Sequence, residues 1–218
     1  MKAGKEGKAA RRGRSFRALG AAAGLALALP GCVSLGVEVP ETLLTLTSTS
    51  TAAAGMSAVS GEEGKAAAIA VLTPETPAKL DVLRVPVNVS PTQIAYLPEA
   101  FWVEKPARLF RRVLGEALRA RTDENAVEPS VLVLDSDDTP LRAGTFLRGT
   151  LSELSYDAQT GSVVVRYDAI RSDAKGAAIT RRFEAREDVG EADPALIGPA
   201  LNRAANTVAG EVAVWMLP

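Results

Sequence analysis

The chain has 218 residues, of which 47% are hydrophobic and only 5% aromatic. It holds one cysteine and no histidine, so an internal disulfide is excluded, and the commonest general base and transition-metal ligand is missing. Basic and acidic side chains nearly balance at 25 and 26, unlike the strongly basic composition typical of nucleic-acid-binding proteins.

Residues 1–31 have the three parts of an export signal. Seven basic residues come first, an apolar run of twelve residues covers Ala18–Leu29, and small residues follow. This run is too short to cross a bilayer, which takes about 20 residues, so we expect the segment to be removed. The alternative is a transmembrane start, in which Cys32 would be an ordinary small apolar residue.

The leader ends in Leu29-Pro30-Gly31-Cys32, which resembles the cleavage site of bacterial lipoprotein signals. Leucine stands three positions before the cysteine and glycine just before it, while proline is a less usual residue between them. The resemblance implies a thioether-linked diacylglycerol on Cys32 and an acyl chain such as palmitate on the new N-terminus. At about 0.8 kcal/mol per buried methylene, several chains make the attachment effectively permanent.

This reading divides the chain into three parts. We expect residues 1–31 to be a lipoprotein signal peptide, 32–41 a lipidated tether and 42–218 a single domain. Because seven basic residues and one acidic residue lie in the leader, the mature chain would carry 18 basic and 25 acidic side chains. A net charge near −7 leaves no basic face for nucleic acid. The length is sufficient for one core of ordinary size.

The first part of the domain predicts short strands joined by irregular segments. Thr42–Leu46, Ala67–Leu72 and Leu80–Val87 are rich in the β-branched and apolar residues that strands favour. Residues 48–65 are rich in Ser, Thr, Ala and Gly without apolar periodicity, which predicts a flexible loop. Pro86 indicates an edge strand or a strand end, because proline donates no hydrogen bond to a neighbouring strand.

An aromatic segment and an amphipathic helix come next. We interpret Tyr96–Trp102 as a loop between a strand and the helix. Pro106 suits the first helical position, and apolar residues recur after it at helical spacing. The apolar face consists of Leu109, Phe110, Val113, Leu114, Ala117 and Leu118. The opposite face consists of Arg108, Arg111, Arg112, Glu116 and Arg119. This pattern predicts a helix that packs on a sheet.

Val131–Leu134 predicts a short buried strand, and three aspartates follow it. They are Asp135, Asp137 and Asp138. Carboxylates are calcium ligands, but the glycine and terminal glutamate of an EF-hand loop are missing. We therefore favour a solvated turn over a calcium site.

The following residues predict an antiparallel meander. Its strands are expected over Thr145–Tyr156, Ser162–Arg171 and Ala178–Glu187. The turns at 157–161 and 172–176 contain Gly and Asp residues, which tolerate positive φ. In the middle strand one face consists of Val163, Val165 and Tyr167, and the other of Val164, Arg166 and Asp168. The first face is expected to be buried and the second solvated.

A second helix closes the domain. It begins at Asp193-Pro194 or at Gly198-Pro199, because both pairs are favourable helix starts. Its apolar stripe consists of Leu201, Ala205, Val208, Val212 and Trp215. The elements together predict an α/β (α+β) domain, in which a mixed, largely antiparallel sheet with a C-terminal meander packs against two main helices.

The sequence offers little chemistry for catalysis. Lipid would occupy Cys32, so no thiol nucleophile remains, and no phosphate-binding Gly-rich loop with its lysine is present. A Ser-Lys or paired-carboxylate site stays open, because such groups meet in space rather than in sequence spacing. We expect no enzymatic activity, no metal, and no cofactor beyond the covalent lipid.

Two sets of residues are candidates for partner binding. Tyr96–Trp102 holds three of the ten aromatic residues, and aromatic side chains often anchor partners. We favour core packing for Trp102, whereas Tyr96 and Phe101 suit either role. The second set consists of the helix arginines Arg108, Arg111 and Arg112. They form either solvated surface or a contact with a partner or with lipid headgroups.

The order of these pieces resembles a known family, the ABC-type transport auxiliary lipoproteins, over about Thr42–Trp215. The pieces are Leu44-Thr45-Leu46, Leu83-Arg84-Val85-Pro86 with Ile94 and Tyr96, Trp102 before Pro106, Leu147–Tyr156 with Val163–Val165, and Ala200–Ala205. Two aromatic positions depart from the family pattern. Leucine replaces a tyrosine before the first Thr-Leu pair, and the aromatic residue of the first meander strand is displaced to Tyr156.

Members of that family are small periplasmic lipoproteins encoded with lipid transporters that contain mammalian-cell-entry (MCE) domains. The resemblance implies an α/β sandwich and a role in moving phospholipid or another hydrophobic substrate across the cell envelope. It also implies an MCE protein, a permease and a separate ATPase as partners, and a homo-oligomer is a further option. Two other classes stay open: an assembly or pilot lipoprotein for an outer-membrane complex, and an envelope hydrolase.

The residue after the cysteine bears on location. Val33 stands where lipoproteins kept in the inner membrane often have aspartate. This favours the outer membrane, with the domain facing the periplasm, while retention in the inner membrane is the alternative.

Overall fold

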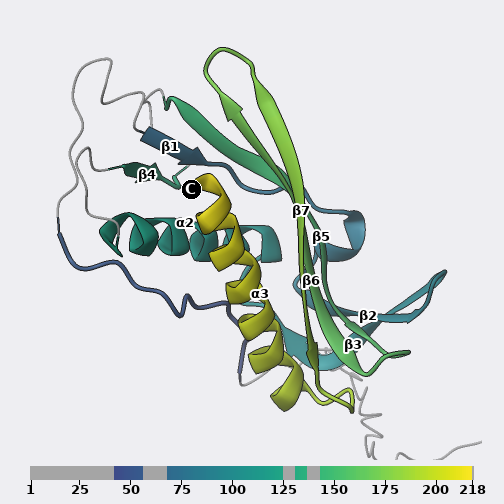
Figure 1. Cartoon of the computed structure of the whole chain (residues 1–218). Coiled ribbons are helices and arrows are strands. Elements are labelled where there is room, and N and C mark those ends of the chain that lie inside the picture. The colour runs from purple at the N-terminus through teal and green to yellow at the C-terminus, as the bar shows by residue number, and fades with distance from the viewer. Residues whose placement is uncertain (1–41, 56–67, 125–130, 137–142, 218) are drawn as a thin grey trace, which may run out of the picture. The chain divides into compact units, whose positions relative to one another are not determined.

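The computed structural model describes residues 42–55, 68–124, 131–136 and 143–217. Its strands are β1 (Ala68–Val71), β2 (Arg84–Ser90), β3 (Gln93–Phe101), β4 (Leu132–Leu134), β5 (Thr145–Asp157), β6 (Ser162–Asp173) and β7 (Ala178–Asp188). Its helices are the 3₁₀ helix η1 (Ala78–Leu80), α2 (Pro106–Glu124) and α3 (Pro194–Met216). They form the mixed sheet with two main helices that the sequence predicts (Figure 1).

Strand β5 is the axis of the sheet because both of its edges are paired. β6 pairs antiparallel with its whole length, and β7 pairs with β6. On the other edge, β1 pairs parallel with residues 145–147 and β2 with residues 156–157. Between these two strands, backbone groups of Glu75 bond to Gly149 and Leu151 at 2.9 Å. Segment 68–90 therefore follows one edge of β5 from end to end.

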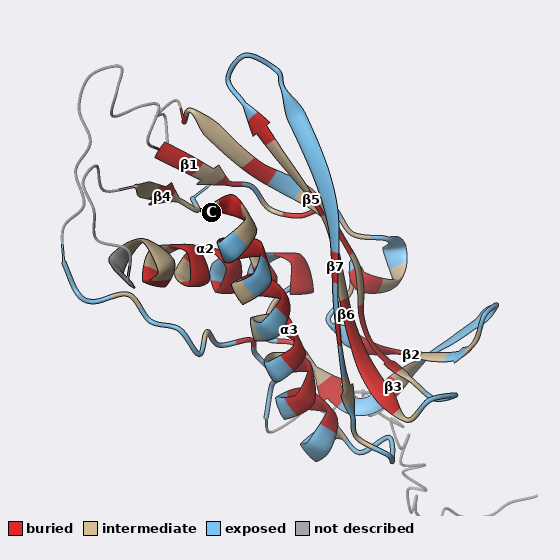
Figure 2. Ribbon diagram, in the orientation of Figure 1, coloured by how far each residue is buried: buried red, intermediate tan, exposed pale blue. Residues whose placement is uncertain are grey.

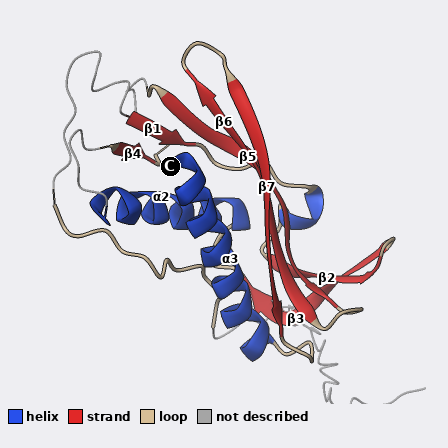
Figure 3. Ribbon diagram, in the orientation of Figure 1, coloured by secondary structure: helices blue, strands red, loops and turns tan. Residues whose placement is uncertain are grey.

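Both main helices cover one face of the sheet, and η1 lies on the other side of the strands (Figure 3). The predicted inner face of β6 is fully buried beneath α3. The buried α3 side chains that face the core are largely small, as the red stretches in Figure 2 show along the helix. They include Ala200, Ala204, Ala205, Val208 and Ala209. Small side chains allow the helix to approach the strands closely.

The face of β6 that alternation predicts to be solvated is partly exposed only from Arg166 onward, because Val164 at its start is buried. Val164 is only 2% exposed although it lies opposite the inner face. Arg186 stands directly across from it on β7, and a long arginine stem covers apolar surface beside it. Arg166 and Asp168 of the same face are partly exposed, as expected.

The two helix starts follow from proline and capping. α2 begins at Pro106, as predicted. The carboxylate of Asp193 accepts a hydrogen bond from the N–H of Ala195 at 2.8 Å, which satisfies a backbone donor at the start of α3. The first of the two candidate starts is therefore used, and Pro199 lies inside the helix.

The N-terminal segment is not the strand that we predicted over Thr42–Leu46. It contains one isolated bridge, from Leu44 to Trp102. The N–H of Thr47 instead donates to the side-chain oxygen of Asn202 in α3 at 2.8 Å. Because a side-chain amide competes here for the backbone donor, the segment lies against the helix rather than in the sheet.

The aromatic segment Tyr96–Trp102 is not a loop, because residues up to Phe101 belong to β3. Glu99 has a φ of 57°, and the pairing of β3 with β2 shifts register over this stretch. Pro98 and the left-handed residue after it interrupt the alternation of side chains. This interruption makes the sequence resemble a loop.

The predicted strand Leu80–Val87 is also displaced. Leu80 ends η1, and β2 begins only at Arg84. Pro86 lies in a strand that has neighbours on both sides, so the prediction of an edge was wrong. β5 pairs with β2 only at Val87 and Asn88. Pro86, which has no backbone N–H to donate, therefore lies at a position where β2 makes no pair with β5.

Other predictions fall partly or wholly outside the described residues. Residues 48–55 contain no helix or strand, as predicted, while the rest of the loop to residue 65 is not described. The leader, Cys32 and two of the three aspartates are outside the described ranges as well. Within those ranges, no helix is long and apolar enough to cross a membrane.

Trp102 packs in the core with 1% of its surface exposed, as predicted. Trp102→Ala should leave a large cavity and lower the free energy of unfolding by about 3 to 5 kcal/mol, measured by urea denaturation. Val103→Ala is the matched control, because Val103 is the next residue and its side chain is 51% exposed. This substitution should change the free energy of unfolding by less than about 0.5 kcal/mol. Equal losses in the two variants would contradict the core assignment.

Two buried tyrosines give a second matched pair. The hydroxyl of Tyr156 donates to the carbonyl of Gly190, whereas the hydroxyl of Tyr167 has no hydrogen-bond partner in the described part of the chain. Burial also raises the pKa of Tyr167. Tyr167→Phe should leave the melting temperature unchanged or raise it, while Tyr156→Phe should cost about 0.5 to 1.5 kcal/mol. A larger loss from Tyr167→Phe would show that its hydroxyl is satisfied.

Candidate functional site

The predicted aromatic pair lies on β3 and is half-buried. Tyr96 has the guanidinium carbon of Arg84 4.9 Å from its ring centroid, which is a cation–π contact. The backbone of Phe101 accepts a hydrogen bond from Leu44 at 2.7 Å. Their backbones are thus fixed in the sheet, while their side chains remain partly accessible at its surface.

The predicted arginine face of α2 is divided. Arg108 and Arg112 are exposed, and Arg112 is paired with Glu104 just before the helix. Arg111 is half-buried. Arg119 bonds both Glu116 at 2.7 Å and Asp135 at 2.5 Å, so it fastens α2 to the end of β4.

Asp135 is the described member of the acidic cluster whose sequence favours a solvated turn over a calcium site. Its carboxylate accepts the hydrogen bond from Arg119. Burial alone would lower the pKa of Arg119, but the two carboxylates outweigh it and raise that pKa. Among the described residues, no group of three or more Cys, Asp or Glu side chains could hold a metal ion.

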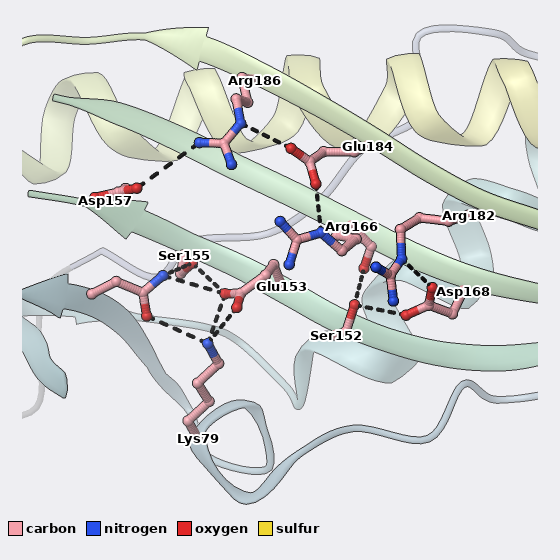
Figure 4. A network of polar contacts seen from close by, with 11 residues as sticks. Lys79, Ser152, Glu153, Ser155, Asp157, Arg166, Asp168, Arg182, Glu184 and Arg186 are labelled. Carbon is pink, nitrogen blue, oxygen red and sulfur yellow. Dashed lines mark hydrogen bonds and ion pairs between the residues drawn. The ribbon is translucent and has the colours of Figure 1, made fainter. Parts of the chain in front are cut away.

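A set of polar side chains crosses the sheet face that the two main helices leave open; we call it the polar band (Figure 4). It consists of Lys79, Asn88, Ser152, Glu153, Ser155, Asp157, Arg166, Asp168, Arg182, Glu184 and Arg186. A shallow hollow of about 280 Å³ lies over part of it. The band contains four cations and four carboxylates, so its formal charge is zero.

One end of the polar band is partly buried. The Lys79 ammonium on η1 lies 2.7 Å from both carboxylate oxygens of Glu153 on β5. Ser155 donates to the same carboxylate at 2.8 Å, and Asn88 donates to Ser155 at 2.9 Å. Burial alone would raise the pKa of Glu153, but the hydrogen bonds from Lys79 and Ser155 outweigh it and lower that pKa.

The other end follows the register of β6 and β7. Arg166 lies directly opposite Glu184, and Asp168 lies opposite Arg182. The Arg182 guanidinium is 2.5 Å from the Asp168 carboxylate, and this hydrogen bond lowers the pKa of Asp168. Hydrogen bonding from Arg166 likewise lowers the pKa of Glu184. Opposite charges in cross-strand positions favour this register of the two strands.

These contacts determine what the polar band can do. A general acid needs a carboxyl pKa raised toward neutrality, whereas Glu153, Asp168 and Glu184 all have lowered pKa values. The cations are occupied by neighbouring carboxylates, so an anionic ligand would have to compete with them. The band is best understood as a self-neutralised solvated face.

Alternation in the sequence predicts only part of this face. It assigns Arg166 and Asp168 to the solvated side of β6. The signal for β7 was present in the alternation of Arg182, Glu184 and Arg186. The partner of Glu153 could not be found in this way, because Lys79 is 74 residues away in the sequence.

The polar band predicts acid sensitivity. A carboxyl group whose pKa is lowered by folding stabilises the protein above its ordinary pKa, here 4.5 for Glu153, and that stabilisation is lost as the pH falls through the folded value. The free energy of unfolding, measured by urea denaturation from pH 6 to pH 3, should therefore fall below about pH 4.5. Glu153→Gln should be less stable at pH 6 and show a shallower fall.

Glu191→Gln is the control for this series, because Glu191 is exposed. Its curve should run parallel to that of the unaltered chain. A Glu153→Gln curve that is also parallel would show that Glu153 contributes nothing to the acid sensitivity.

Comparison with known proteins identifies the fold and the family. A family model described as "ABC-type transport auxiliary lipoprotein component" matches residues 45–213. No curated protein matches the sequence. The crystal structure of an uncharacterized protein matches with a TM-score of 0.59 and 13% identity, over 80% of this chain and 99% of that one.

A second crystal structure, of a Xanthomonas campestris protein of family DUF330, has a TM-score of 0.61 and 17% identity. It covers 81% of this chain and 95% of that one. At these identities the structures show a common fold. The family model, in contrast, spans most of the sequence, including β1 to β7 and nearly all of α3. The chain therefore belongs to the family of ABC-type transport auxiliary lipoprotein components.

Proposed function

We propose that this chain is the lipoprotein adaptor of an MCE-type ABC transporter that moves phospholipid or another hydrophobic substrate across the cell envelope. The observation that carries the proposal is the family match over residues 45–213 behind a leader that ends in a lipoprotein-type cleavage site. The family is described as a lipoprotein auxiliary component of ABC-type transport, which favours a place in the cell envelope. The MCE partnership and the substrate class are our extension of it.

The described surface is consistent with an adaptor that has no catalysis of its own. Its one large polar network is internally neutralised, and the carboxyl groups with shifted pKa values are all in ion pairs. Energy for transport would come from a separate ATPase, because the sequence has no phosphate-binding loop of its own. The chain would act by binding and positioning.

The anchor would be the lipid on Cys32. Ten residues, 32–41, separate it from the described domain, and an extended chain of that length reaches about 33 to 36 Å. We propose that the anchor lies in the outer membrane, because Val33 follows the cysteine, and that the domain faces the periplasm.

The partner surface is proposed on two sets of side chains. Tyr96 and Phe101 present half-buried rings on β3, and Arg108 and Arg112 extend from α2 into solvent. Charged groups that remain accessible raise the rate of association with an oppositely charged partner. Arg112 is itself paired with Glu104, so Arg108 is a better candidate for steering than the paired cations of the polar band.

Co-purification tests this proposal. The full chain, expressed with its neighbouring transport genes and extracted from membranes, should co-purify with an MCE protein, a permease and an ATPase. Arg108→Glu with Arg112→Glu should weaken the association at least about tenfold at low salt, and added salt should weaken it in the unaltered chain. Arg148→Glu is the control, because Arg148 is an exposed arginine of β5.

Cys32→Ser separates anchoring from assembly. The variant should remain as an unlipidated precursor, whereas the unaltered chain should fractionate with outer-membrane markers. Recovery of the unaltered chain only with inner-membrane markers would contradict the location. Co-purification with secretion-pore subunits in place of an MCE protein would contradict the adaptor role itself.

A further inference from the structure

A hollow of about 610 Å³ lies between the second half of α2, the C-terminal half of α3 and β7; we call it the helix hollow. It is on the helix side of the sheet, away from the polar band. Ligand pockets usually enclose about 300 to 1,000 Å³, so the helix hollow is large enough for a small molecule.

Small and apolar residues form half of its lining. They are Ala117, Ala120, Gly210, Ala213, Val214 and Trp215. A Cβ added to Gly210 would meet no atom within 4 Å, so the space above this glycine is open. The half-buried indole of Trp215 packs edge-on against Phe183 of β7, with ring centroids 5.7 Å apart. This apolar part of the lining suits an alkyl chain.

Two arginines line the same hollow. The Nε of Arg121 is buried, and it has no hydrogen-bond partner among the described residues. Arg181 lies over the ring of Phe183, 4.9 Å from its centroid. Among the described residues that line it, Glu211 is the only acidic one, so this part of the lining has an excess of positive charge. A buried donor without a partner is unfavourable until an acceptor satisfies it.

We propose that the helix hollow binds an anionic amphiphile, with its phosphate or carboxylate head on Arg121 and Arg181 and its alkyl chain over Gly210 and against Trp215. An anion would supply the acceptor that Arg121 Nε lacks, and guanidinium groups suit phosphate and carboxylate oxygens. The proposal deepens the proposed function, on which it rests, by placing a site for the hydrophobic substrate on this chain.

Octyl phosphate is a suitable probe, because it combines a phosphate head with one short alkyl chain. The full chain, held in nanodiscs of neutral phosphatidylcholine, would be titrated with octyl phosphate while tryptophan fluorescence and the melting temperature are followed. Trp215 lines the hollow, whereas Trp102 is buried in the core. We expect a saturable fluorescence change that disappears in Trp215→Phe, and a raised melting temperature that remains in that variant.

Two other ligands distinguish the sources of binding. Inorganic phosphate has the head alone, and octyl glucoside has the chain alone. Each should bind at least about tenfold more weakly than octyl phosphate, because each loses one half of the contacts. Equal binding of inorganic phosphate would show a simple anion site, and equal binding of octyl glucoside would show a simple apolar surface; either result would overturn the proposal.

Three variants test the named residues. Arg121→Gln and Arg181→Gln should each weaken octyl phosphate binding about tenfold. Gly210→Leu should fill the space and abolish binding while the protein stays folded, as its melting curve would show. Arg148→Gln, an exposed arginine outside the hollow, should bind normally. Unchanged binding in Gly210→Leu and both arginine variants would overturn the proposal.

The assay contains no transporter, so its outcome is separate from that of the co-purification. A chain that assembles with an MCE protein but gives no saturable response to octyl phosphate would overturn only the lipid site. A chain that binds octyl phosphate but does not assemble would overturn the adaptor role and leave the site in place.

Discussion

The pairing of β5 on both edges is the constraint on which the rest of this domain depends. A strand with a neighbour on each side has no edge exposed to solvent, so only its two faces can contact helices or solvent. The inner face accepts the helices, and Leu151 and Leu154 of β5 are fully buried. The outer face stays open to solvent and holds the polar band. The position of every other element is set relative to these two faces.

The close approach of α3 to the sheet has a second consequence. Its alanines and glycines pack the backbone against β6 and β7, but they also leave a hollow beside the second half of α2. Gly210 faces such a space, whereas a Cβ on Gly198 would meet Leu44 at 2.7 Å. The same helix is therefore tightly covered near its start and open near its end. In the described part of the N-terminal segment, Leu44 and Thr47 cover the start of α3, whereas Ser50 borders the hollow near its end.

The sequence predicts those elements whose signals are local. The meander, the start of α2 at Pro106 and the burial of Trp102 follow from alternation, proline placement and the scarcity of aromatic residues. The bulge of β3 defeats the same reasoning, because Pro98 and the left-handed Glu99 break the alternation within a continuous strand. Segment 42–46 fails for another reason: asparagines of α3 take up backbone donors just beyond it.

The partners of the charged residues cannot be predicted from local sequence patterns. Alternation assigns Arg166 and Asp168 to a solvated face, but only the register with β7 determines that each has an opposite charge across from it. Arg121 and Arg181 lie 60 positions apart, on a helix and a strand, and no sequence pattern indicates that they line one hollow. Ion pairing occupies Arg166 and Asp168, whereas the Nε of Arg121 has no hydrogen-bond partner in the described part of the chain and is available to a ligand. Whether an arginine is structural or functional in this fold thus depends on which carboxylates the sheet brings to it.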